Sequence, residues 1–111
     1  MADRDAILAG VFGFDWDAGN VEKIWRTHAV AAAEAEQALL NRPLLVSPDR
    51  AHSAMEARFF ALGEARAGRR LAVVFTIRGD RIRVISARPM SRKERIVYAE
   101  AKAQAETDTG I

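Results

Sequence analysis

Arginines are concentrated around one predicted β-hairpin, at a spacing that suits the binding of phosphate. Arg81 and Arg83 alternate along a strand-like run, so their side chains are expected on the same face. If no bulge intervenes, the opposite face carries Ile82, Val84, Ser86 and, at the end of the strand, Arg88. A guanidinium group is a planar fork of donors that matches phosphate oxygens. With Arg58 and Arg78 on neighbouring strands, these arginines are candidates for a phosphate site, although arginines on a sheet are often only solvated.

A second group of residues could transfer a proton or orient an arginine. Glu56 and Arg58 are two positions apart on a predicted strand, so their side chains are expected on one face. His52 precedes them in a polar loop, where an imidazole with a pKa near neutrality could exchange a proton with a substrate hydroxyl. A surface ion pair and a solvated loop histidine are the plainer alternatives, and both stay open.

The charge of the chain is strongly polarised, although its formal net charge is only +2. Residues 66–95 contain ten basic and two acidic residues, whereas the rest of the chain contains seven basic and thirteen acidic residues. Nine of the ten basic residues in this window are arginines. This asymmetry indicates a polyanionic partner at one face. A codon bias toward arginine, combined with ordinary solvated strands, is the alternative explanation.

The hydrophobic pattern predicts which elements position these residues. It favours an α+β fold: an edge strand, two helices, a small, mainly antiparallel sheet and a last helix. Asp17 is the expected N-cap of the first helix, Pro43 follows the second, and Ser91 and Glu94 form a capping box before the last. The predicted strands are 13–16, 56–62, 71–77 and 81–87, and the predicted helices are 18–28, 31–40 and 91 to about 104. A short linker between the first two helices suggests a helical hairpin.

Composition limits the class of protein. The 111 residues, half of them hydrophobic, predict one domain over 1–111 with an ordered core from about 12 to 104. The absence of cysteine excludes disulfides and thiolate metal sites and indicates a cytoplasmic protein. No signal peptide or long apolar run is apparent, so no membrane contact is expected. With two histidines and no recognisable metal motif, we expect neither a metal nor a cofactor.

Several strings of residues, in this order, resemble the BrnT family of type II toxins. The most specific is the run from Ile82 to Arg88 followed by Glu94, Arg95 and Tyr98. The others are Phe14-Asp15-Trp16-Asp17, His28 with Val30, Pro48-Asp49, His52-Ser53, Glu56-Ala57-Arg58-Phe59 with Gly63, Val73-Val74-Phe75-Thr76, and Arg92-Lys93. The similarity spans roughly residues 12–100. One departure is His28-Ala-Val-Ala-Ala, where the family often has His-Gly-Val-Ser-Phe, so the turn after the first helix is expected to be rebuilt.

The resemblance implies a RelE-like fold and a metal-independent ribonuclease that inhibits translation. Its partners would be RNA and a BrnA-like antitoxin, with operator DNA contacted only through the antitoxin complex. Cleavage would proceed by attack of a ribose 2′-hydroxyl on the adjacent phosphate. The expected catalytic residues are Arg58, Arg83, Arg88, Glu56 and His52, with either of the last two as the proton acceptor. The expected RNA-binding residues are Arg78, Arg81, Arg92, Lys93 and Tyr98, although packing is the favoured role for Tyr98.

Two other functions fit the same residues. A non-catalytic nucleic-acid-binding module needs only the basic face, because phosphate affinity requires no proton transfer. A partner-interaction protein could use the same arginines to receive an acidic segment of another chain. An enzyme acting on a small phosphorylated metabolite is less favoured, because the sequence has no glycine-rich phosphate loop.

Overall fold

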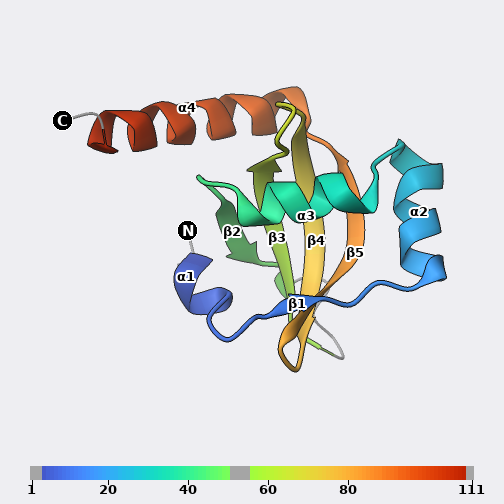
Figure 1. Ribbon diagram of the computed structural model, residues 1–111. Coiled ribbons are helices and arrows are strands. Elements are labelled where there is room, and N and C mark those ends of the chain that lie inside the picture. The colour runs from blue at the N-terminus through green and yellow to red at the C-terminus, as the bar shows by residue number, and fades with distance from the viewer. Residues whose placement is uncertain (1–3, 51–55, 110–111) are drawn as a thin grey trace.

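The computed structural model describes residues 4–50 and 56–109, and it confirms the α+β class (Figure 1). Within those ranges, no helix is both long and apolar enough to cross a membrane. The last helix continues to Thr109, beyond the predicted end near Gln104. The helices are α1 (Arg4–Ile7), α2 (Ala18–His28), α3 (Ala32–Leu40) and α4 (Arg92–Thr109), and the strands are β1 (Gly13–Phe14), β2 (Leu45–Pro48), β3 (Arg58–Glu64), β4 (Arg70–Arg78) and β5 (Arg81–Pro89).

The strands form one mixed sheet in the order β1-β5-β4-β3-β2. Strands β2 to β5 pair antiparallel with their neighbours, whereas the short β1 pairs in parallel with the start of β5. The predicted edge strand and the predicted β4–β5 hairpin are both confirmed. Gly79 in the hairpin turn has a φ of +62°, a left-handed conformation that glycine adopts at little steric cost.

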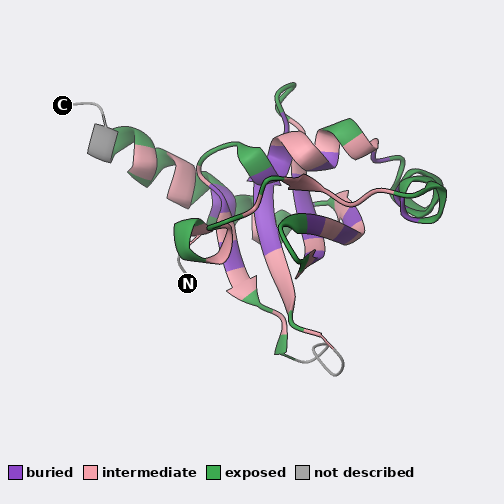
Figure 2. Cartoon of the chain, turned by 60° about the horizontal axis from the view of Figure 1, so that its bottom comes forward, coloured by how far each residue is buried: buried purple, intermediate pink, exposed green. Residues whose placement is uncertain are grey.

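Helices α2 and α3 are consecutive, but each packs mainly against the sheet. Helix α2 begins with the predicted cap, because the Asp17 carboxylate accepts a hydrogen bond from the backbone N–H of Asn20 at 3.0 Å. It then packs beside β5, with Asn20 and Ile24 as its buried residues, while α3 crosses β3 and β4 (Figures 1 and 2). The predicted helical hairpin is therefore not confirmed.

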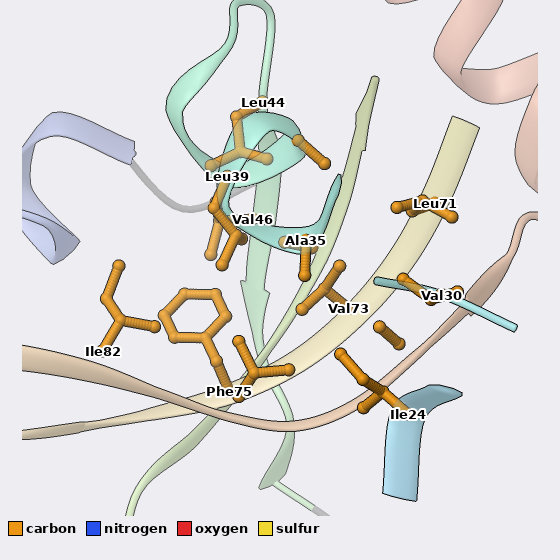
Figure 3. Close-up of a cluster of buried hydrophobic side chains, with 14 residues drawn as sticks. Ile24, Val30, Ala35, Leu39, Leu44, Val46, Leu71, Val73, Phe75 and Ile82 are labelled. Carbon is orange, nitrogen blue, oxygen red and sulfur yellow. The ribbon is translucent and has the colours of Figure 1, made fainter. Parts of the chain in front are cut away.

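The face of the sheet under α3, here called the inner face, holds the main hydrophobic core. Leu71, Val73 and Phe75 of β4 point into it, together with Ile82 and other buried side chains (Figure 3). Gly63 of β3 allows α3 to approach closely, because a Cβ at this position would overlap the Ala38 carbonyl oxygen. The helix and the sheet are thus in direct backbone contact at this point.

The opposite face, here called the outer face, is covered by α4 at one end only. Tyr98 of α4 is fully buried there against Leu62, Ala72 and Met90. Its hydroxyl donates to the carbonyl oxygen of Pro43 at 2.7 Å, and burial raises its pKa to about 12. The rest of α4 projects beyond the sheet (Figures 1 and 2). The outer face is thereby divided into a covered half under α4 and an open half.

A β-bulge in β5 changes which side chains lie on the outer face. Val84 pairs with Phe75 and Ser86 pairs with Val74, so Ile85 is the extra residue between them. Arg83 and Ser86, predicted on opposite faces, therefore share the outer face. Arg88 also joins this face, whereas simple alternation had placed it with Ile82. The prediction was wrong because one inserted residue inverts the alternation that follows it.

Candidate functional site

A row of three polar residues crosses the open half of the outer face. Thr76 of β4 pairs with Arg58 of β3 on one side and with Arg83 of β5 on the other. Thr76 is buried, and its hydroxyl donates to the Ala57 carbonyl oxygen at 2.7 Å. Two strand spacings separate the backbones of the arginines, or about 10 Å, which long side chains can bridge from both sides. The structure thus places two of the predicted catalytic arginines in one row.

Arg83 is held by carboxylates next to the N-terminus of α2. Its guanidinium donates to Asp17 at 2.8 Å and lies 3.6 Å from an oxygen of Asp15. The hydrogen bond from the Asn20 backbone N–H, followed by that from Arg83, lowers the pKa of the Asp17 carboxyl. Two of the guanidinium nitrogens take part in these contacts, and an arginine has five N–H donors, so donors remain for a phosphate.

Glu56 lies just before β3 and is paired with Arg78. The Arg78 guanidinium donates to both carboxylate oxygens, at 3.1 and 3.3 Å. This hydrogen bonding lowers the pKa of Glu56, and the positive charges of Arg78, Arg58 and Arg83 act in the same direction. Glu56 is therefore ionised at neutral pH and lies within the electrostatic influence of both row arginines. The structure brings four of the predicted residues into one neighbourhood.

A cleft of about 590 Å³ lies beside the row. Six of its lining residues come from α2 and four strands: Lys23, Ser47, Arg58, Phe60, Val74 and Ser86. A smaller hollow, lined by Asp17 and Arg83, shares Lys23 and Ile85 with the cleft, so the two depressions adjoin. Sequence reasoning missed Lys23, Ser47 and Phe60. Strand alternation from Arg58 could have placed Phe60 on this face, whereas no sequence signal linked Lys23 to β3.

Arg88 lies on the same face at the edge of the covered half, and its side chain is more exposed than that of Arg83, at 39% against 20%. Its guanidinium donates to both oxygens of Glu94 at 2.7 and 2.9 Å, which lowers the pKa of Glu94 to about 2. Its partner Ala72 is four residues from Thr76 along β4, so the backbones of Arg88 and Arg83 are about 13 Å apart. The structure therefore does not bring Arg88 together with Arg58 and Arg83.

The predicted RNA-binding residues are scattered. Arg81 is exposed beside β1, where it donates to the Phe14 carbonyl oxygen at 3.4 Å, and Arg92 and Lys93 are exposed at the start of α4. Tyr98 is fully buried, so it packs as favoured from the sequence and does not offer its ring or hydroxyl to RNA. His52 lies outside the described residues.

Comparison with known proteins identifies the family. The family model for the BrnT ribonuclease toxin of type II toxin-antitoxin systems matches residues 16–94. The chain belongs to this family. The crystal structure of the Brucella abortus ribonuclease toxin BrnT is similar to it, with a TM-score of 0.56 and 25% sequence identity, over 74% of this chain and 100% of that one. No curated protein matches the chain.

The BrnT family match includes the strands of both halves of the outer face, but only the start of the helix that covers one of them. It includes β2 to β5 and the Arg88–Glu94 pair, but most of α4 lies beyond it. It also includes the turn after α2. Ala29 there has a φ of +52°, a conformation that favours glycine, and Arg69 donates to the Ala29 carbonyl oxygen at 2.7 Å. The turn after α2 thus has an alanine in a glycine-type position, and a hydrogen bond from an arginine holds its backbone.

Proposed function

We propose that the open half of the outer face is the RNA-cleaving site of this BrnT-family toxin. The observation that carries the proposal is the row of Arg58, Thr76 and Arg83 beside an open cleft, in a chain that belongs to a family of ribonuclease toxins. In the proposed reaction, the ribose O2′ loses its proton and forms a bond to the adjacent phosphorus, while the bond to O5′ breaks and O5′ takes up a proton from solvent. The products are a 2′,3′-cyclic phosphate and a 5′-hydroxyl.

The arginines supply charge where the reaction develops it. Negative charge builds on the non-bridging oxygens of the phosphate as O2′ attacks, and donors fixed in advance stabilise it most effectively. Arg58 and Arg83 approach the row from two different strands, and the carboxylates of Asp15 and Asp17 fix the orientation of Arg83. We assign Arg88 to holding α4 instead, because a single carboxylate, Glu94, binds both of its terminal nitrogens at 2.7 and 2.9 Å, whereas one of the two carboxylate contacts of Arg83 is 3.6 Å long.

Two groups are candidates for the proton acceptor, and the pH profile separates them. A base works when deprotonated, so activity rises as the pH passes its pKa. The hydrogen bond from Arg78 lowers the pKa of Glu56 below the ordinary value of 4.5, so Glu56 as the base predicts a rate that is flat above about pH 5. His52 as the base predicts a rate that rises through about pH 6.5. The single-turnover cleavage rate, measured from pH 4.5 to 8.5, therefore decides between Glu56 and His52 as the proton acceptor.

The same proposal includes the partners and the compartment. A toxin of a type II system implies an antitoxin partner and an RNA substrate. We propose that the antitoxin is BrnA-like, that it carries any contact with operator DNA, and that the toxin acts in the cytoplasm without a bound metal. The single-domain organisation and the RelE-like fold remain part of this prediction.

Mapped RNA ends test the proposed reaction. Purified protein is incubated with total RNA in excess EDTA, and new ends are analysed for cyclic phosphate and 5′-hydroxyl groups. Wild type should cleave, whereas Arg83→Gln should not. Glutamine is preferable to glutamate here, because a third carboxylate beside Asp15 and Asp17 would threaten folding. The control is Arg66→Gln, which removes the same charge from the exposed β3–β4 turn. Intact RNA from folded wild type would contradict the proposal and favour a binding or partner-interaction module.

A further inference from the structure

We infer that the cleft beside the arginine row is a subsite for one RNA base, with Phe60 as its stacking platform. The inference rests on the proposed function and adds to it the group that binds next to the scissile phosphate. A sheet surface with an exposed aromatic ring is a common way to bind a splayed base of single-stranded RNA.

Phe60 lies at the border between the two halves of the outer face. It is two residues from Arg58 on β3 and two residues from Leu62, which α4 buries. Its own burial is intermediate, and it lines the cleft. Val74 and Ile85 line the same cleft and extend the apolar floor around the ring. A flat, uncharged base would bury this floor, which α4 leaves uncovered.

Two hydroxyl groups lie at the ends of the same cross-strand row. Ser47 pairs with Phe60, Phe60 pairs with Val74, and Val74 pairs with Ser86. Both serines line the cleft, and neither side chain forms a hydrogen bond with another described residue. A hydroxyl is both a donor and an acceptor. The two serines are three strand spacings apart, or about 14 Å, so a base that extends from the ring over Val74 can reach Ser86 but not Ser47 as well. We assign Ser86 to a polar edge of the base and Ser47 to a neighbouring group of the same RNA.

The spacing of the two rows fits a nucleotide. The row of Arg58 and Arg83 is two residues from the row of Phe60, or about 7 Å along the strands. A phosphate at the arginines and its attached base at Phe60 would span this distance. Lys23 reaches the cleft from α2 and adds a positive charge on the side away from β2. The cleft volume of about 590 Å³ lies within the usual range for ligand sites.

Binding of short single-stranded RNA tests the subsite. The probe carries 2′-O-methyl groups, so that O2′ cannot attack, and versions with one abasic position are prepared on either side of a single target phosphate. Fluorescence anisotropy is measured for wild type, Phe60→Leu and Phe60→Trp. Loss of stacking in Phe60→Leu should weaken binding of the complete probe by about 5- to 150-fold. The same variant should bind one of the abasic probes as wild type does, and Phe60→Trp should retain binding.

A second, smaller substitution keeps the test valid if Phe60→Leu disturbs the fold. Phe60 also packs against the Tyr98 cluster, so Phe60→Leu is compared with Ser86→Ala, which removes only one cleft hydroxyl. Ser86→Ala should weaken binding of the complete probe while leaving the abasic one unchanged. Equal weakening of all probes by Phe60→Leu and Ser86→Ala would overturn the subsite, while cleavage by wild type would leave the proposed function standing. A folded wild type that neither binds nor cleaves RNA would overturn both.

Discussion

The covered and open halves of the outer face carry similar residues but differ in what those residues contact. In the covered half, Arg88 is paired with Glu94, and Glu64 accepts hydrogen bonds from Arg70 at 3.1 Å and Lys102 at 2.8 Å. The Arg70 guanidinium also lies 5.5 Å from the centre of the Tyr98 ring. In the open half, Arg58 lines the cleft and Arg83 lines the adjoining hollow, and α2 borders both depressions through Lys23.

On the proposed assignment, the carboxylate partners of each arginine decide what it can bind. Arg83 and Arg88 come from the same strand and, after the bulge, from the same face. Both carboxylate oxygens of Glu94, at the start of α4, accept hydrogen bonds from Arg88. A phosphate could bind Arg88 in the same way only by displacing this carboxylate. Asp17 binds one terminal nitrogen of Arg83 at 2.8 Å, but Asp15 lies 3.6 Å from the other, so a phosphate would have to displace only a long contact there. A shared face is thus insufficient to predict a shared role.

Removing the Tyr98 ring should have the largest effect on the covered half. Tyr98→Ala is expected to lower the free energy of unfolding by about 3–5 kcal/mol, because it leaves a cavity under α4 and an unpaired Pro43 carbonyl. Urea denaturation measures this change, with the exposed Ile96→Ala on the same helix as the control. Cleavage should persist wherever the variant is folded. A stable Tyr98→Ala protein that no longer cleaves RNA would place Tyr98 in the open site.

The Arg88–Glu94 pair should contribute a smaller, pH-dependent stability. Glu94→Gln is expected to lower the free energy of unfolding by about 1–2 kcal/mol at pH 7. The pKa of Glu94 is about 2 in the folded chain, below its ordinary value of 4.5, so its contribution is complete above pH 4.5 and is lost as the pH falls toward 2. The stability difference between wild type and Glu94→Gln should therefore shrink over this interval. A difference that is constant from pH 7 to 2 would contradict the assignment.

A change away from both halves should have the smallest effect. Ala29→Gly places glycine at a φ of +52° and is expected to raise the free energy of unfolding by about 0.5–1 kcal/mol. Ala31→Gly is the control, because Ala31 has a φ of −78° and gains nothing from glycine. Thermal unfolding measures both, and cleavage should not change in either. A loss of activity in Ala29→Gly would indicate that the turn after α2 contributes to the site.

The sequence allowed most elements to be predicted, because local signals determine them. The cap at Asp17, the turn at Gly79 and the continuous run of β-branched and aromatic residues in β4 are properties of neighbouring residues. The family resemblance also followed from strings of residues in order. These signals place Arg58 and Arg83 on the sheet, but they do not show which long-range contacts each side chain makes.

The missed features all depend on contacts between distant segments. The bulge at Ile85 appears only in the pairing of β4 with β5, and it inverts the predicted position of Arg88. The contact of Tyr98 with Pro43 depends on the path of α4 across the outer face. Lys23 reaches the cleft because α2 packs beside β5 rather than against α3.

Cleavage by Arg58→Gln and Arg88→Gln, measured side by side, tests the central claim most directly. Each variant removes one guanidinium from the outer face, and the single-turnover rate on one defined RNA is measured at a temperature where both are folded. Arg58→Gln should lose about 10²- to 10³-fold in rate, as expected when a donor to the developing charge is removed. Arg88→Gln should be less stable but cleave at close to the wild-type rate. Equal losses in both variants, or a larger loss in Arg88→Gln, would contradict the division of the outer face into a catalytic and a structural half.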